Sequence, residues 1–91
     1  MTDPLTRTVT IRNKRGLHAR ASMAFVTLAA SQAVELTVEK DGSSASGSSI
    51  LDLMMLGAAK GDTITISAEG DGAEDAVQAL AELVEARFGE D

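Results

Sequence analysis

The sequence predicts a small α+β domain with an open-faced β-sandwich fold, in which three helices cover one face of a four-stranded, mostly antiparallel sheet. The chain has 91 residues, 44% of them hydrophobic, which suits one compact domain and leaves little room for a second. Segments that alternate apolar and polar residues, as strands do, are interleaved with segments of helical spacing. Each helical segment carries a single apolar stripe, so the helices are expected to share one side of the sheet while polar strand residues face water on the other.

The first half of the chain predicts a strand followed by a helix. Residues 6–13, TRTVTIRN, place Val9 and Ile11 between polar neighbours, as in a strand with one buried face. Residues 17–31, LHARASMAFVTLAAS, are rich in alanine. Their apolar stripe at helical spacing is predicted to consist of Ala19, Met23, Val26 and Ala30.

A hairpin and a short helix are predicted next. Residues 33–40, AVELTVEK, alternate again, and Asp41-Gly42 is a strong two-residue hairpin signal before a polar strand in residues 43–48. The stretch SILDLMMLG at residues 49–57 predicts a short helix that Gly57 stops.

The last two elements are a strand and a helix. A fourth strand is predicted at residues 63–67, within DTITISAEG. Asp71, with Glu74 three residues later, resembles a capping box at the start of the final helix. The apolar stripe of that helix is predicted to be Ala76, Val77, Leu80, Leu83 and Val84. The predicted order is therefore β-α-β-β-α-β-α.

Composition excludes several classes of function. The chain has no cysteine, so it can hold neither a disulfide nor a thiolate metal site, and we predict no metal and no cofactor. No apolar run approaches the roughly 20 residues that span a bilayer, and the first residues lack a secretory signal, so a cytoplasmic protein without membrane contact is expected. The net charge of −6 and the two aromatic residues, both Phe, argue against nucleic acid as a partner.

The basic residues are nevertheless concentrated near the only histidine. Five of the eight lie within the first 20 positions: Arg7, Arg12, Lys14, Arg15 and Arg20. Asp3 is the only acid in that stretch, which predicts a local anion site. Arg7 and Arg12 have a simpler interpretation, which is to keep an edge strand soluble.

His18 follows Gly16 and Leu17 at the predicted junction between the first strand and the first helix. Gly16 permits a tight bend, and the amides of the first helical turn have no partner within the helix. Those amides and the helix dipole favour an anion, so a neutral, nucleophilic imidazole is expected, and the forked guanidinium of Arg20 suits phosphate oxygens. The residues thus predict a phosphoryl group carried on His18; the alternative is a histidine that only caps the helix or lies on the surface.

Two motifs resemble one family. The stretch GLHARA at residues 16–21, followed by SMAFV, resembles the active-site motif of the histidine-containing phosphocarrier proteins (HPr) of the phosphoenolpyruvate-dependent phosphotransferase system. The stretch GSSILDLMMLGAAKGDTITISAEG at residues 47–70 is similar to the family's second signature. The resemblance covers nearly the whole chain and implies a single HPr-like phosphocarrier domain spanning residues 1–91.

The resemblance implies the relay partners and the roles of the site residues. His18 would accept a phosphoryl group on Nδ1 from phosphorylated Enzyme I and pass it to a histidine on an EIIA-type protein. Arg20 would steady the phosphate, and Ala19, Arg20 and Gly16 would form its binding site. Such a protein is a monomeric carrier that two other proteins phosphorylate and dephosphorylate, more than a turnover enzyme.

The resemblance to the family also draws attention to two further positions, one that differs from the family's motif and one that matches a regulatory residue. The family usually has proline after the arginine, where this chain has Ala21, which favours the regulatory, nitrogen-related NPr branch over a sugar-uptake carrier. Ser49 is a natural helix N-cap. It also matches the family's regulatory serine, phosphorylated in some bacteria by HPr kinase/phosphorylase, although the adjacent Ser48 is an alternative.

The short helix carries more apolar residues than one face can bury. Leu53 and Leu56 suit the core. A partner-binding surface is predicted from the others together with the first helix: Met23, Ile50, Leu51, Met54 and Met55, extended by Val26. Methionines that merely fill gaps in the core are the alternative for Met54 and Met55. The alternative function is a small regulatory or protein-interaction α+β domain in which His18 is not phosphorylated.

Overall fold

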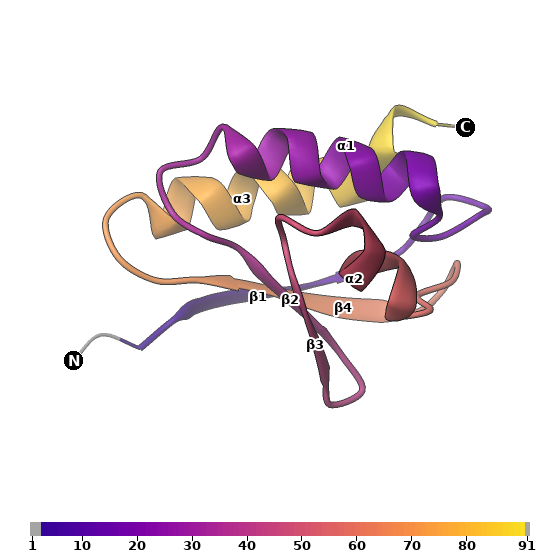
Figure 1. Ribbon diagram of the computed structural model, residues 1–91, viewed down its shortest axis with the longest axis horizontal. Coiled ribbons are helices and arrows are strands. Elements are labelled where there is room, and N and C mark those ends of the chain that lie inside the picture. The colour runs from indigo at the N-terminus through magenta and orange to yellow at the C-terminus, as the bar shows by residue number, and fades with distance from the viewer. Residues whose placement is uncertain (1–2, 91) are drawn as a thin grey trace.

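The computed structural model describes residues 3–90 and has the predicted order of elements. The helices and strands are β1 (Leu5–Thr10), α1 (Ala19–Ala30), β2 (Thr37–Lys40), β3 (Ser43–Ser46), α2 (Ile50–Met55), β4 (Thr63–Ala68) and α3 (Ala73–Glu85), followed by a 3-10 turn, η1 (Arg87–Gly89). Helices α1 and α3 lie side by side on one face of the sheet, and α2 packs against α1 and β3 (Figure 1). The predicted α+β fold, an open-faced β-sandwich, is confirmed.

The sheet has the strand order β1-β4-β2-β3, and all three pairings are antiparallel. The hairpin between β2 and β3 turns at Asp41 and Gly42, whose φ angles of 51° and 86° are both left-handed, as a type I′ turn requires. The strand β1 lies at an edge, where the exposed Arg7 pairs with Glu85 of α3 at 3.4 Å. The solubility role expected of this arginine therefore fits its place at the edge.

A single hydrophobic core fills the space between the sheet and the helices. Alternation sets the inner face of the strands, since Ile64, Ile66 and Ala68 of β4 are buried while Thr63 is exposed. The helix α3 adds most of its predicted stripe, namely Ala76, Val77, Leu80 and Val84, together with Ala73 and Ala81. Within residues 3–90, none of the helices has the length and apolar character of a membrane span.

The predicted buried face of α1 is wrong. Ala19, Met23 and Ala30 are exposed and Val26 is half-buried, whereas the core side of the helix consists of Ala21, Ser22, Phe25 and Ala29. The alanines made two stripes look equally apolar, and the aromatic ring of Phe25 decides between them because it has the larger surface to bury. Ser22 tolerates burial because its hydroxyl donates to the Leu17 carbonyl at 3.2 Å.

The predicted capping box at Asp71 is also wrong. Helix α3 begins one residue later than that pattern requires, with Gly72 as its N-cap and no side-chain cap. Gly72 has a φ of 92°, and a Cβ there would lie 3.2 Å from the Cβ of Ala33. A glycine is therefore favoured by both the backbone conformation and the close packing.

Candidate functional site

The loop between β1 and α1 folds around a buried asparagine. The side chain of Asn13 is 0% exposed, and its Nδ2 donates to the carbonyl of Gly16 at 2.8 Å. The amide of Gly16 donates back to the Asn13 carbonyl at 3.3 Å, and the amide of Leu17 donates to the carbonyl of Ala58 at 3.0 Å. These bonds fix the backbone at the residue that precedes His18.

His18 is the N-cap of α1. Its backbone is extended, with φ −77° and ψ −177°, and its Nδ1 accepts a hydrogen bond from the amide of Arg20 at 3.2 Å. The first regular helical bond runs from the Ser22 amide to the His18 carbonyl at 2.8 Å. The imidazole thus substitutes for the usual Ser or Asp cap, and Nδ1 lies at the first turn of α1, whose amides have no partner within the helix.

Glu90 is a residue of the site that sequence reasoning missed. Its Oε2 lies 2.9 Å from Nε2 of His18, and its Oε1 accepts from Nδ2 of Asn13 at 3.1 Å. The contact joins residues 72 positions apart. No local pattern could have found it, because it depends on how the chain turns after α3.

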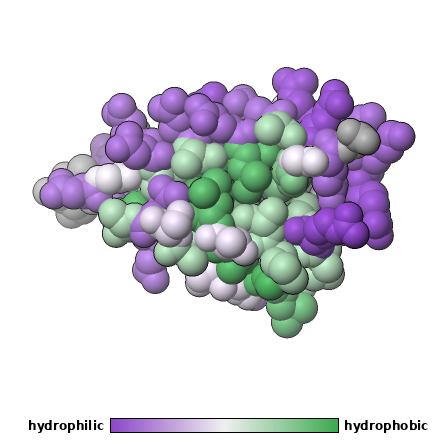
Figure 2. All heavy atoms as spheres, turned by 90° about the horizontal axis from the view of Figure 1, so that it is seen from above, coloured by the Kyte–Doolittle hydropathy of each residue, from purple (hydrophilic) through white to green (hydrophobic). Residues whose placement is uncertain are grey.

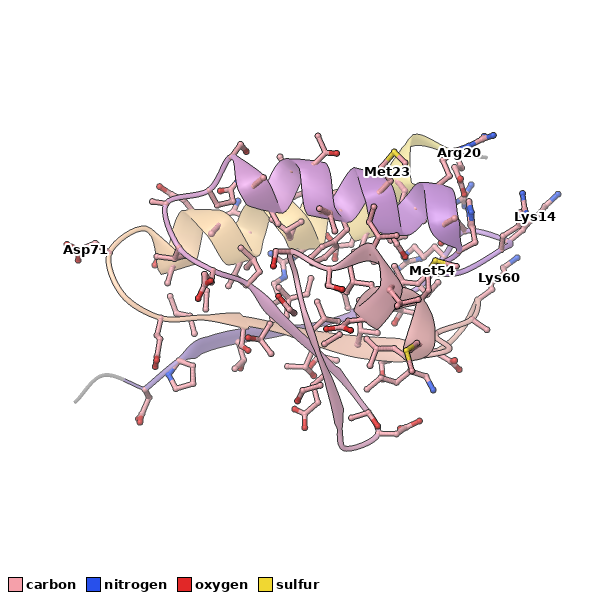
Figure 3. All side chains as sticks on the ribbon, viewed as in Figure 1. Lys14, Arg20, Met23, Met54, Lys60 and Asp71 are labelled. Atoms are coloured by element: carbon pink, nitrogen blue, oxygen red, sulfur yellow. The ribbon has the colours of Figure 1, made fainter. Side chains whose placement is uncertain are left out.

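The first turn of α1 is electrostatically suited to an anion. It contains the basic Arg20 and no acidic residue, the reverse of the arrangement that stabilises a helix N-terminus. Lys14, Arg15 and Arg20 line a surface hollow together with residues 88–90. Lys14, Arg20 and Lys60 lie at the same end of the molecule (Figure 3). An acidic chain therefore presents a basic end beside its histidine.

The packing of the loop before His18 requires a glycine at position 16. Its φ is 64°, and a Cβ at this position would lie 2.3 Å from the carbonyl oxygen of Ala58. Its amide and carbonyl are both occupied by Asn13. Of the other residues predicted to bind phosphate, Ala19 is the first residue of α1 and the Arg20 amide faces Nδ1; phosphate binding by these residues stays a prediction.

Ser49 is the N-cap of α2, as predicted from its position. Its Oγ accepts from the amide of Asp52 at 3.1 Å. The neighbouring Ser48 lies outside the helix, and its Oγ lies 2.8 Å from Oγ of Ser46. Of the two serines, Ser49 is therefore the one that caps the helix with the exposed apolar residues.

The apolar residues singled out on α1 and α2 are mostly exposed. We use the term apolar patch for Met23, Leu51, Met54 and Met55, whose exposed fractions run from 40% for Met54 to 76% for Met55. Ile50 and Val26 are half-buried, and Leu53 fills the core as expected. Figure 2, which looks down on the helices, shows an apolar area bordered by hydrophilic residues. The interpretation of Met54 and Met55 as core fillers is therefore wrong.

A sequence profile described as "PTS HPr component phosphorylation site" matches residues 5–86. "Phosphocarrier protein HPr" of Neisseria meningitidis is 43% identical over 86 residues, covering 94% of this chain and 97% of the relative. "Phosphocarrier protein NPr" of Shewanella violacea is also 43% identical, covering 94% of both chains. Relatives of both names match equally well, so the preference for the nitrogen-related branch stays a prediction.

Solved structures have the same fold. The crystal structure of HPr-C-His from Thermoanaerobacter tengcongensis matches with a TM-score of 0.89 and 41% identity, covering 96% of this chain and 98% of that one. A phosphocarrier protein HPr from Bacillus anthracis matches with a TM-score of 0.86 and 36% identity, covering 91% of this chain and 99% of that one.

Proposed function

Because the chain belongs to the HPr family of phosphocarrier proteins of the phosphotransferase system, we propose that His18 accepts a phosphoryl group from phosphorylated Enzyme I and passes it to an EIIA-type protein. The position of Nδ1 among the first-turn amides of α1 is the observation that carries the proposal. Those amides can donate to phosphate oxygens, as amides do at other helix N-termini that bind anions. We propose that the whole chain acts as one cytoplasmic, monomeric domain.

The acceptor atom is Nδ1. A lone pair is available there when the proton resides on Nε2, and the bond from the Arg20 amide, at 3.2 Å, is at the long end of the usual range. When phosphorylated Enzyme I releases its phosphoryl group, the bond from phosphorus to the donor atom breaks and a bond to Nδ1 forms. The Arg20 amide can then donate to a phosphoryl oxygen, and the guanidinium of Arg20 supplies a permanent positive charge.

The apolar patch is the surface we propose for docking. It lies on α1 and α2, and Figure 3 places Met23 and Met54 toward the same end of the molecule as Arg20. Methionine side chains adapt to different partner shapes, which suits a carrier that must bind Enzyme I and an EIIA-type protein in turn. The half-buried Ile50 lies next to Ser49 on the same helix.

Phosphorylation of Ser49, by an HPr kinase/phosphorylase where one exists, is the regulation we propose. A phosphate there adds a charge of about −2 beside the apolar patch. Docking buries that surface, so an added charge weakens it.

The test of the relay is incubation with Enzyme I and radiolabelled phosphoenolpyruvate. The wild-type protein is expected to acquire an acid-labile, base-stable label. His18→Ala is expected to acquire none while keeping its fold, because the loss of a helix cap and one side-chain hydrogen bond costs less than the stability of a typical domain. A wild-type protein that stays unlabelled would favour the alternative of a regulatory or interaction domain.

A further inference from the structure

The carboxylate of Glu90 bridges two donors of the site. Oε2 lies 2.9 Å from Nε2 of His18 and Oε1 lies 3.1 Å from Nδ2 of Asn13. The asparagine is fully buried and also bonded to the Gly16 carbonyl, so it cannot follow a moving partner. The side chains of His18 and Glu90 are only 15% and 20% exposed. The bridge therefore connects the imidazole to a fixed point in the core.

The chain adopts an unusual conformation to place Glu90 there. Arg87, Phe88 and Gly89 have φ angles of 60°, 55° and 78°, and two successive non-glycine residues in the left-handed region are uncommon. Phe88 is 8% exposed and packs into the core. Such conformations persist only where surrounding contacts enforce them, and they concentrate at functional sites. Here the enforced turn directs the next residue, Glu90, toward His18.

Both ring nitrogens of His18 have partners that specify the same tautomer. A carboxylate can only accept, so with a neutral imidazole Nε2 must carry the proton and donate it to Glu90. An amide can only donate, so Nδ1 must be unprotonated where it faces Arg20. Partial burial favours the neutral acid at Glu90, but the hydrogen bonds from Asn13 and His18 and the positive charge of Arg20 outweigh it and lower the pKa of Glu90. The carboxylate is thus maintained at neutral pH.

We infer that Glu90 is a positioning residue for phosphoryl acceptance, which holds His18 in the Nε2–H tautomer and leaves the Nδ1 lone pair free to attack phosphorus. The inference rests on the proposed function. In the transfer the bond from phosphorus to the donor atom of Enzyme I breaks, the bond to Nδ1 forms, and the Nε2 proton stays in place. The ring of His18 thereby becomes cationic, and the hydrogen bond to the Glu90 carboxylate, in which only the acceptor was charged before, becomes an ion pair with charge on both partners.

This change of the hydrogen bond has a direct consequence for the equilibrium. The cationic ring adds a Coulomb attraction to the hydrogen bond that the Glu90 carboxylate already accepts, so Glu90 stabilises the phosphorylated form more than the free form. Removing the carboxylate is expected to lower the equilibrium ratio of phosphorylated to free protein about fivefold at a fixed ratio of donor forms. A residue that only supports the fold would not shift this ratio.

The experiment compares Glu90→Ala and Glu90→Gln with the wild type, using Glu74→Gln, an exposed acid in the first turn of α3, as the matched control. The imidazole nitrogens are observed by 15N NMR at about pH 8.5, where histidine is ordinarily neutral, without Enzyme I. The wild type and the control are expected to show one Nε2–H tautomer. In Glu90→Ala the two tautomers are expected to mix, so the 15N shifts of Nδ1 and Nε2 move toward each other. Glu90→Gln is expected to lie between Glu90→Ala and the wild type, because its amide oxygen can still accept the Nε2 proton.

The second measurement is the phosphorylated fraction at equilibrium with Enzyme I. An approximately fivefold lower ratio for Glu90→Ala supports the inference, and a wild-type ratio together with unchanged 15N shifts overturns it while leaving the relay intact. A failure of the relay itself would leave the wild type unlabelled. The 15N shifts would still decide whether Glu90 sets the tautomer, so the two failures are distinguishable.

Discussion

The Cα of Gly16 lies against the backbone of Ala58, so closely that a Cβ at Gly16 would be 2.3 Å from the Ala58 carbonyl oxygen and 2.9 Å from the Cα of Ala59. The same carbonyl accepts the amide of Leu17 at 3.0 Å. The loop before His18 therefore contacts the loop between α2 and β4, and both loops contribute main-chain atoms to this contact. Since main-chain atoms cannot rotate away, this contact sets the distance between the histidine loop and the rest of the fold.

Gly16→Ala is expected to destabilise the protein by about 3 kcal/mol or more, from a left-handed φ and a clash with the backbone. Gly57→Ala is a matched control, because Gly57 has a φ of 65° and a Cβ there would have nothing within 4 Å. Its cost is expected to be about 1 kcal/mol, from conformation alone. Urea unfolding of both variants measures the difference. Equal losses would mean that the contact with Ala58 relaxes without cost.

The sequence predicted the order of the helices and strands correctly, but it did not predict which face of every helix is buried. Strand alternation and the Asp41-Gly42 turn are local properties, and they predicted the sheet correctly. The face of α1 depends on which of two apolar stripes meets the sheet, and only packing around Phe25 decides this. Because the sequence does not decide between the two stripes, Met23 was predicted both for the buried stripe of α1 and for the exposed partner-binding surface. The structure shows it exposed.

The candidate site divides in the same way. His18, Arg20 and Ser49 lie at helix starts, which the change from strand to helix pattern indicated for the first two and the capping preference of serine for the third. Glu90 and Asn13 join the site through contacts between distant parts of the chain. Glu90 also requires the left-handed turn at Arg87 and Phe88, for which neither residue type gives a signal.

The contribution of Glu90 to stability is expected to disappear in acid. The pKa of Glu90 is lowered from its ordinary value of 4.5, so the folded state favours the carboxylate more than the unfolded state does. The stabilisation is therefore complete well above pH 4.5 and is lost as the pH falls through the lower folded value. Wild type and Glu90→Gln should differ in free energy of unfolding by a constant amount near neutrality, and that difference should shrink below pH 4.5. A difference that stays constant through the acid range would contradict the bridge to Asn13 and His18.

Arg20→Lys is expected to slow phosphorylation by Enzyme I about tenfold, which corresponds to losing about 1.4 kcal/mol of transition-state stabilisation. An ammonium preserves the charge but cannot donate as a planar fork. Arg15→Lys is the control, because Arg15 lines the same hollow and is exposed but lies outside the first turn of α1. Initial rates of labelling measure both variants. Equal rates for Arg20→Lys and the wild type would assign Arg20 only a general electrostatic role.

Ser49→Asp tests the docking surface separately from the chemistry at His18. The new carboxylate would lie at the start of α2, next to Ile50 and Leu51, where docking must remove water. Asp is also a good N-cap, so the helix should remain and His18 should stay competent. We expect kcat/KM for phosphorylation by Enzyme I to fall about fivefold, equivalent to about 1 kcal/mol of lost binding.

Ser49→Ala separates the added charge from the lost hydroxyl. It removes the bond from the Asp52 amide and is expected to cost about 1 kcal/mol of stability, yet it adds no charge and should be phosphorylated on His18 at the wild-type rate. Titrating Enzyme I at fixed concentrations of each variant distinguishes weaker docking from slower chemistry, because excess Enzyme I restores the rate only in the first case. If Ser49→Asp follows the wild-type curve throughout, a charge at this position does not hinder docking, and Ser49 acts only as the cap of α2.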